Sequence, residues 1–330
     1  QFNATLFLGC MKKQGSGFLE GLDSGGWSAQ KPPYLKDGDE VALVAPARWL
    51  AEEHLVAAED WLRSVGLVPV RAPHVLGVWN QFSGSDAERA ADLEWALRRA
   101  SVRAIWCVRG GYGSARAVDL VDWNLLKEDP KWMVGYSDPT VLLAAAWCAG
   151  VASIHGTMPV NVSGNSTESL RTLNAVWRGE ASVGWKIAAP SPAEWEELGW
   201  RAGTARGPLV GGNLSVLFSL LGSKTFPNLK GCLLFLEDLD EYVYHVDRML
   251  VGLKRSGALQ GVVGVVVGGM TDLHDNAVPF GRSVGSLVLE HFPKVPVASG
   301  FPMGHLADNQ AFGYGGVYTL QIGDFAELRP

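Results

Sequence analysis

The sequence predicts an α/β fold made of two units. From Glu40 onward, short apolar runs typical of buried strands alternate with longer stretches whose apolar residues recur at helical spacing. This alternation weakens between residues 160 and 205 and resumes beyond residue 206. Because parallel strands need helical crossovers between them, the pattern indicates parallel sheets covered by helices.

The composition excludes several classes of protein. The chain has 330 residues, of which 47% are hydrophobic and 19% charged, so it is long enough for two domains and too apolar for a disordered protein. With a net charge of -6 and no dense Lys/Arg block, it lacks the electrostatic footprint of a nucleic-acid binder. The longest nearly apolar stretch, 141–154, is too short to span a membrane.

The cysteines favour free thiols over disulfides or a zinc site. The four, Cys10, Cys107, Cys148 and Cys232, lie far apart in the sequence, and three of them fall inside apolar runs. This usage predicts a reducing compartment, and we expect a cytoplasmic location.

Each element of the first half has its own signal. The expected strands lie at 40–46, 67–70, 104–108, 132–135 and in a segment that ends at 154, and the expected helices at 55–65, 86–100, 114–127 and 139–149. Gly66 follows the first helix, where a C-terminal glycine belongs. Three loops, 45–48, 109–113 and 136–138, follow strand ends, which is where parallel sheets bind ligands.

The chain divides into four expected segments. Residues 1–35 form a leader without periodicity, 36–165 the N-terminal domain, 166–205 a linker with a variable loop, and 206–330 the C-terminal domain. In the last segment we expect helices at 211–221, 242–256 and 281–291, strands at 232–237 and 262–269, and a polar loop at 304–316.

Ser137 stands directly between an expected strand and an expected helix, in the motif Gly135-Tyr136-Ser137-Asp138-Pro139. A hydroxyl at a helix N-terminus lies beside free backbone N–H groups that stabilise a developing oxyanion, as in a nucleophile elbow. The alternative is an ordinary helix-capping serine. The motif also has Pro139 in place of the closing glycine of the usual elbow.

The glycine-rich loop Arg109-Gly110-Gly111-Tyr112-Gly113 lets a ligand approach the backbone closely. It lacks the lysine and the spacing of a phosphate-binding loop, so a nucleotide site is not expected. The alternative is a tight turn with a solvated arginine.

Two further residue types complete the candidate chemistry. Glu237 ends an apolar strand and could orient an imidazole, although the acidic run that it begins also fits a solvated helix start. His305 lies in a polar loop and His155 follows a strand, so either could be a base or an ordinary polar residue. His274-Asp275 has no third ligand nearby, and we expect no metal and no other cofactor.

Taken together, the motifs resemble the LD-carboxypeptidases, serine peptidases of the LdcA and microcin C immunity (MccF) type. The resemblance covers about residues 36 to 325. Its motifs occur in the family's order: VALVAPA at 41–47, FSGSDAERAADLEWAL at 82–97, IWCVRGGYGSAR at 105–116, GYSDPT at 135–140, HGTMP at 155–159, GPLVGGNLSVL at 207–217, LEDLDEYVYHVDRML at 236–250 and GHLADN at 304–309. Such a series is far more specific than any one motif.

The resemblance implies a flavodoxin- or Rossmann-like parallel-sheet domain followed by a smaller α/β domain of the swivelling type. It implies Ser137 as nucleophile, His305 as general base and Glu237 as its partner. The oxyanion hole would be the backbone N–H groups of Gly111 and Asp138. The expected substrate contacts are Arg109, Tyr112, His155 and Asn213, with Arg109 holding a free carboxylate.

The implied activity is release of terminal D-alanine from murein tetrapeptides during peptidoglycan recycling, by an enzyme that we expect to be a homodimer. One alternative is an immunity hydrolase that cleaves a peptidyl-nucleotide amide, with aromatic residues at 177–200 stacking on the base. Another is a cleft-binding protein without catalysis. Pro139, Thr157 and the tryptophan-rich middle depart from the family pattern and leave the substrate open.

Overall fold

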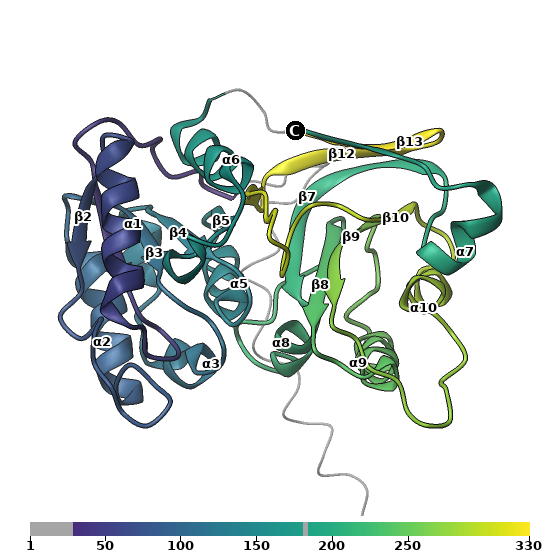
Figure 1. Cartoon of the computed structure of the whole chain (residues 1–330), viewed down its shortest axis with the longest axis horizontal. Helices are drawn as coiled ribbons and strands as arrows, with labels where there is room; N and C mark the ends of the chain where they lie inside the picture. Colours follow the sequence, from purple (N-terminus) through teal and green to yellow (C-terminus); the bar gives the residue numbers. More distant parts are fainter. Residues whose placement is uncertain (1–28, 181–183) are drawn as a thin grey trace, which may run out of the picture.

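The computed structural model describes residues 29–180 and 184–330. Figure 1 shows two α/β units side by side, each built around its own sheet. The first sheet has six strands in the order β11-β5-β4-β3-β1-β2, and the second has seven in the order β10-β9-β8-β7-β12-β13-β6. The predicted α/β class with two units is confirmed.

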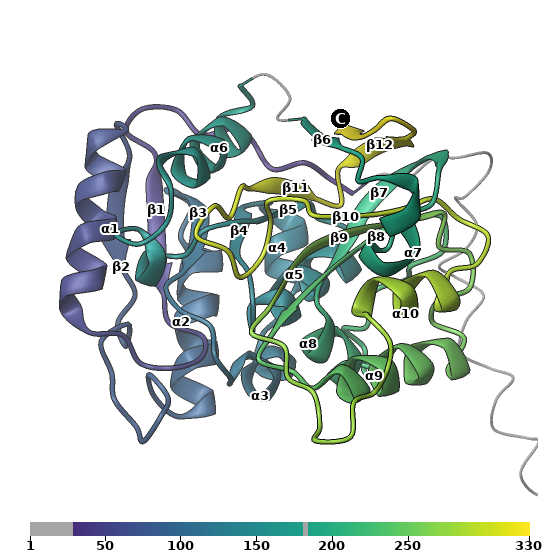
Figure 2. The same cartoon turned by 45° about the vertical axis from the view of Figure 1, so that its right-hand side comes forward.

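The first sheet has the flavodoxin-like strand order 2-1-3-4-5. Its five parallel strands are β1 (Glu40–Val44), β2 (Val68–Arg71), β3 (Val102–Cys107), β4 (Trp132–Gly135) and β5 (Ser153–His155). A sixth strand from the end of the chain, β11 (Phe312–Tyr314), pairs antiparallel with β5, and Figure 2 shows the two together.

Right-handed crossovers place helices on both faces of this sheet. They are α1 (Glu52–Ser64), α2 (Asp86–Arg98), α3 (Ser114–Ala117), α4 (Asn124–Glu128), α5 (Thr140–Cys148) and α6 (Thr167–Arg178), with 3₁₀ turns η1 (Val118–Leu120) and η2 (Pro159–Asn161). Trp61 of α1 and Trp177 of α6 both pack on Trp106 of β3, so one apolar cluster joins two helices to the sheet.

The helix expected near 114–127 is wrong as a continuous element, because it is divided into α3, η1 and α4. The Trp123 indole donates to the carbonyl of Val118, and the Asp122 carboxylate accepts the backbone N–H of Asn124. These side-chain hydrogen bonds compete with the backbone hydrogen bonds of a continuous helix, so a new helix, α4, begins at Asn124.

The second sheet is half parallel and half antiparallel. Its strands are β6 (Trp185–Ala188), β7 (Gly203–Asn213), β8 (Leu233–Leu239), β9 (Gly264–Thr271), β10 (Val297–Ser299), β12 (Val317–Ile322) and β13 (Phe325–Arg329). In the parallel half, β7 to β10, each connection carries a helix: α8 (Leu214–Ser219) follows β7, α9 (Val243–Arg255) follows β8 and α10 (Val284–His291) follows β9. The short α7 (Trp195–Leu198) and η3 (Pro192–Glu194) precede β7.

The segment 166–205, which we expected as a linker, contains regular structure within its described residues, 166–180 and 184–205. It contains α6, whose Trp177 packs on the first unit, and β6, which pairs with β13 of the second. At the other end, Gln30 bridges to Val151 and Leu35 is buried, so the part of the expected leader that is described packs against the first unit. Residues 1–28, including Cys10, lie outside the described residues.

Within residues 29–180 and 184–330, no helix is both long and apolar enough to cross a membrane. Cys107 and Cys232 are buried free thiols, and Cys148 is a partly buried one. Burial raises the pKa of Cys148 to about 11 and that of Cys232 to about 12, so both stay protonated at neutral pH.

Candidate active site

Three side chains from distant parts of the chain meet where the two units join. Ser137 lies between β4 and α5, Glu237 near the end of β8, and His305 in the loop between β10 and β11. His305 Nε2 is 3.1 Å from Ser137 Oγ, and its Nδ1 is 2.6 Å from Glu237 Oε2. The imidazole therefore links the hydroxyl to the carboxylate.

Ser137 occupies a strained turn. Its φ is +63°, in the left-handed region that costs an L-residue about 1–2 kcal/mol. Gly135 permits the turn, because a Cβ there would lie 2.8 Å from Cβ of Pro139. The side chain is thereby lifted out of the sheet at the start of α5, as a nucleophile elbow requires.

A bulge in β9 brings the His305 loop to Glu237. Leu236 of β8 pairs with Val267 and Asp238 with Met270, so two residues of β9, Gly268 and Gly269, oppose the single residue Glu237. At this bulge the N–H of Gly269 donates to the carbonyl of Met303. A Cβ on Gly268 would lie 2.3 Å from the same carbonyl oxygen, so the loop could not approach a larger residue.

Gly304 completes the approach. Its φ is +98°, and a Cβ would lie 2.7 Å from both Cβ and Oε2 of Glu237. With glycine at this position, the N–H of His305 donates to Glu237 Oε2 at 3.2 Å, alongside the ring contact. The Asn309 side chain holds the loop by accepting the N–H of Gly304.

The surroundings adjust the basicity of the imidazole. The Glu237 side chain is fully buried, whereas that of His305 is 15% exposed. Burial of the ring disfavours its charged form, but the Glu237 carboxylate outweighs this effect and raises the pKa of His305 above its usual value. The ring of Tyr136 lies edge-on to the imidazole at 5.0 Å between centroids and limits its rotation.

The backbone above Ser137 offers free donors. The N–H groups of Gly111 and Asp138 have no acceptor among the residues that the structure describes. A Cβ on Gly110 would lie 3.2 Å from Ser137 Oγ and 3.3 Å from the Asp138 nitrogen, so Gly110 keeps this space open. An oxyanion formed on attack by Ser137 would fit there.

The carboxylate of Asp138 fixes the glycine-rich loop. It accepts the N–H groups of Gly113 and Ser114, at 3.2 and 2.9 Å. The buried Arg89 donates from the other side to the carbonyls of Pro46 and Gly113. Asp138 and Arg89 therefore hold the glycine-rich loop in a fixed position beside Ser137. Electrostatic catalysis needs donors that are positioned in this way before the reaction.

Comparison with known proteins identifies this arrangement. A family model described as the LD-carboxypeptidase N-terminal domain matches residues 41–156, and one described as the C-terminal domain matches residues 206–320. The chain belongs to the LD-carboxypeptidase family. This LD-carboxypeptidase is a serine-type peptidase, as the sequence predicted.

Individual relatives agree with the family. The murein tetrapeptide carboxypeptidase of Pseudomonas aeruginosa is 30% identical, over 85% of this chain and 92% of its own length. The muramoyltetrapeptide carboxypeptidase structure from Oxalobacter formigenes has a TM-score of 0.79 at 26% identity, over 88% and 98% of the two chains. MccF in complex with glutamyl sulfamoyl guanosine also has a TM-score of 0.79, but at 20% identity, over 90% and 97%, so it shows the shared fold.

Two of the substrate contacts predicted for this LD-carboxypeptidase are not accessible. His155 has no exposed surface, its ring stacks on Phe312 at 4.9 Å, and burial lowers its pKa to about 4. Asn213 is 3% exposed, and its side chain caps α8 and donates to Asp238. His155 is covered by β11, which pairs with its strand, and the Asn213 side chain is engaged as the N-cap of α8.

The other two predicted contacts are accessible. Tyr112 is 47% exposed, and Arg109 is half-buried with its guanidinium donating to the carbonyl of Trp49. Arg48, in the loop after β1, packs on Gly111 and was not among the predicted contacts. The sequence feature that could have pointed to Arg48 is its position in the loop 45–48, one of the three loops that follow strand ends.

The tryptophans between residues 177 and 200, expected to face the substrate, are packed inside the protein. Trp177, Trp185 and Trp200 are each no more than 5% exposed, and the half-buried Trp195 donates to the carbonyl of Pro190. They contribute to the cores of the two units and present no stacking platform to a nucleobase.

His274, which was considered with Asp275 as a metal-binding pair, contacts another carboxylate, that of Asp240. His274 Nε2 is 2.6 Å from Asp240 Oδ1 at an exposed site, and Tyr242 lies beside the ring. In the described part of the chain, no three His, Cys, Asp or Glu side chains gather as a metal site would require.

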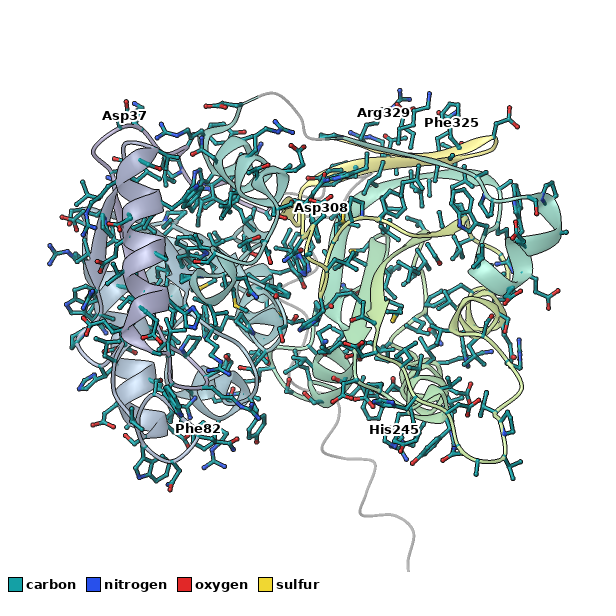
Figure 3. All side chains as sticks on the ribbon, viewed as in Figure 1. Asp37, Phe82, His245, Asp308, Phe325 and Arg329 are labelled. Carbon is teal, nitrogen blue, oxygen red and sulfur yellow. The ribbon has the colours of Figure 1, made fainter. Side chains whose placement is uncertain are left out.

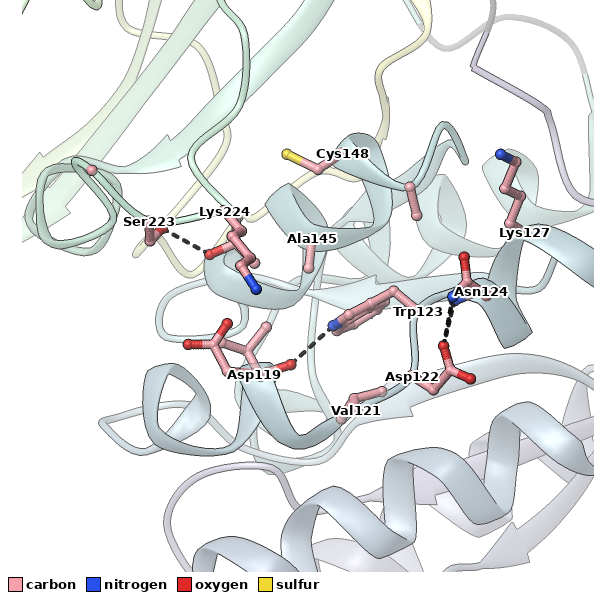
Figure 4. Close-up of a pocket in the computed structure, with 14 residues that line it drawn as sticks. Asp119, Val121, Asp122, Trp123, Asn124, Lys127, Ala145, Cys148, Ser223 and Lys224 are labelled. Carbon is pink, nitrogen blue, oxygen red and sulfur yellow. Dashed lines mark hydrogen bonds between the residues drawn. The ribbon is translucent and has the colours of Figure 1, made fainter. Parts of the chain in front are cut away.

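A cavity of about 730 Å³ lies elsewhere, between the two units (Figure 4). Residues 118–127 and 145–149 of the first unit form one part of its lining, and residues 222–225 of the second form the rest. It meets the C-terminal end of α5, whereas Ser137 precedes the N-terminal end, about 13 Å away along the nine-residue helix. The cavity shares no residue with the Ser137 site.

Proposed function

We propose that this LD-carboxypeptidase releases the terminal D-alanine of murein tetrapeptides by hydrolysing the preceding L,D-peptide bond. The observation that supports this most is the continuous contact from Glu237 through His305 to Ser137, beneath two free backbone N–H groups. The family and the names of the relatives point to murein peptides as substrates.

In the proposed mechanism, neutral His305 Nε2 takes the proton of Ser137 as its oxygen attacks the carbonyl carbon. The N–H groups of Gly111 and Asp138 stabilise the resulting oxyanion. The imidazolium then protonates the nitrogen of the departing D-alanine, which leaves a tripeptidyl ester on Ser137. A water molecule, deprotonated by the same imidazole, hydrolyses that ester and restores the enzyme.

Glu237 supports both proton transfers. Its Oε2 accepts Nδ1–H of His305, which selects the tautomer with a free Nε2 and stabilises the imidazolium. Because the carboxylate also accepts the backbone N–H of His305, ring and backbone are held by the same atom. The two units contribute different parts, since nucleophile and oxyanion donors belong to the first and base and carboxylate to the second.

The nucleotide-cleaving alternative has less support. The aromatic residues expected to stack on the base, the tryptophans at 177–200, are buried or packed. The homodimer, the cytoplasmic location and the role in peptidoglycan recycling stay predictions.

Mass spectrometry tests the proposal. Incubation of a murein tetrapeptide with the protein should give a tripeptide and free D-alanine, and the Ser137→Ala protein should give neither. A peptidyl sulfamoyl nucleoside is the competing substrate. Hydrolysis of that compound without loss of alanine from the tetrapeptide would contradict the proposal and favour the immunity-type reaction.

A further inference from the structure

We propose that Arg48 and Arg109 together form the site that binds the free terminal carboxylate of the substrate, so that this pair makes the enzyme an exopeptidase. The inference rests on the proposed function and adds a residue, Arg48, that sequence reasoning did not find. Arg109, which was predicted to bind the carboxylate alone, would share this role with Arg48.

Two adjacent glycines, Gly110 and Gly111, lie between Arg48 and the nucleophile. The ideal Cβ position of Gly111 lies 2.6 Å from Cδ and 2.9 Å from Nε of Arg48, so the arginine side chain packs directly on this glycine. The ideal Cβ position of the neighbouring Gly110 lies 3.2 Å from Ser137 Oγ. Arg48 therefore packs on the residue that directly follows the glycine facing the attacking oxygen.

This spacing suits the removal of a single amino acid. The Cα of the released residue is about 3.8 Å from the Cα before it, and its carboxylate follows directly. A cation that recognises this carboxylate must therefore lie within about one residue of the scissile carbonyl. Arg48, which packs on Gly111, is placed for this role, and Arg109 begins the same glycine-rich loop.

The charges of the pair are not compensated within the described part of the chain. Neither Arg48 nor Arg109 forms an ion pair with a carboxylate there, whereas the nearby Arg89 and Arg116 both bind Asp86. Burial and the positive charge of Arg48 lower the pKa of Arg109. An anion bound between the two guanidinium groups would offset their mutual repulsion. A carboxylate suits this position because its shape matches that of a guanidinium group.

The fold supports the same position. Arg48 follows β1 and Arg109 follows β3, the adjacent strands between which the chain order reverses. Ligands of doubly wound sheets bind outside this point. The carbonyl of Trp49 holds the guanidinium of Arg109, and the backbone of Arg48, whose side chain is exposed, bridges to Phe82, labelled in Figure 3 at the lower edge of the first unit.

The test compares two tetrapeptides, one ending in D-alanine and one in D-alaninamide. The wild-type enzyme should prefer the free acid, and Arg48→Gln and Arg109→Gln should each lower kcat/KM for the acid about 10- to 100-fold, mainly through KM. The loss for the amide should be several-fold smaller than the loss for the acid, so each change should reduce the preference for the acid. Arg109→Lys, which keeps the charge, should retain part of the preference.

Arg116→Gln is the matched control, because its guanidinium lies near the same loop but is bound to Asp86. It should leave the preference for the acid unchanged. Labelling of Ser137 by a fluorophosphonate probe, which carries no carboxylate, should fall far less in Arg48→Gln than kcat/KM for the acid. Retention of the full acid preference in both Gln variants, or its absence in the wild type, would overturn the proposal.

Binding separates this inference from the proposed function. The Ser137→Ala protein should bind the acid more tightly than the amide, and adding Arg48→Gln should remove the difference. If the wild type released no alanine but this difference persisted, the proposed reaction would fail and the anion site would stand. Equal binding of acid and amide would overturn the anion site even if alanine were released.

Discussion

Oε2 of Glu237 accepts two hydrogen bonds from one residue, the Nδ1–H of His305 at 2.6 Å and its backbone N–H at 3.2 Å. A single carboxylate oxygen therefore sets both the position of the His305 loop and the tautomer of its ring. Its neighbour Asp238 is equally buried, but it accepts hydrogen bonds from Asn213, Ser215 and Leu239 and not from His305. These two adjacent acids have different tasks.

Replacing Glu237 by Gln should lower turnover by about 10⁴-fold, because the amide removes the charge that stabilises the imidazolium and permits the wrong tautomer. Asp238→Asn should leave turnover within about tenfold of the wild type. It should instead lower stability by about 1–3 kcal/mol, since an amide cannot accept from all three donors. Turnover and urea midpoints measured on both variants check this division, and a larger loss of turnover in Asp238→Asn would reverse it.

The pH dependence should follow His305. Only the neutral imidazole can accept the Ser137 proton, and Glu237 raises the pKa of His305, so kcat/KM should fall on the acid side with a midpoint above about 6.5. In Glu237→Gln the carboxylate is gone and burial remains, so the midpoint should move below that value. An NMR titration of His305 measures the same shift without catalysis. An unchanged midpoint in the variant would show that Glu237 does not control this proton.

Ser137→Ala and Ser137→Gly should both abolish hydrolysis, since each removes the nucleophile. They should differ in stability. At a φ of +63°, glycine avoids the clash that alanine keeps, so Ser137→Gly should be more stable than Ser137→Ala by about 1 kcal/mol. Urea unfolding of the two inactive proteins isolates the backbone strain, and equal midpoints would argue that the turn stores none.

Gly110→Ala should inactivate the enzyme without unfolding it. The new Cβ would lie 3.1–3.3 Å from Ser137 and the Asp138 nitrogen, where the oxyanion must sit, and kcat should fall about 10²- to 10³-fold. Gly323→Ala is the control, because a Cβ there has no neighbour within 4 Å. Steady-state kinetics with thermal melting checks both variants, and near-normal turnover of Gly110→Ala would place the oxyanion elsewhere.

The sequence by itself determined the features that depend on local pattern. Alternating strand and helix signals predicted the first unit, and the placement of Ser137 between a strand and Pro139 made it a candidate for an elbow, beside the alternative of a capping serine. Both follow from short-range physics, since apolar periodicity and helix-start chemistry act within a few residues. The ordered series of motifs added the family.

Only the tertiary structure decided which side chains reach the site. The buried state of His155 depends on β11, a strand more than 150 residues later, and the approach of His305 to Glu237 depends on the glycine bulge of β9. Arg48 and Arg109 are 61 positions apart and meet because β1 and β3 are neighbours in the sheet. Exposure and contact arise from such long-range packing, and no local pattern in the sequence encodes them.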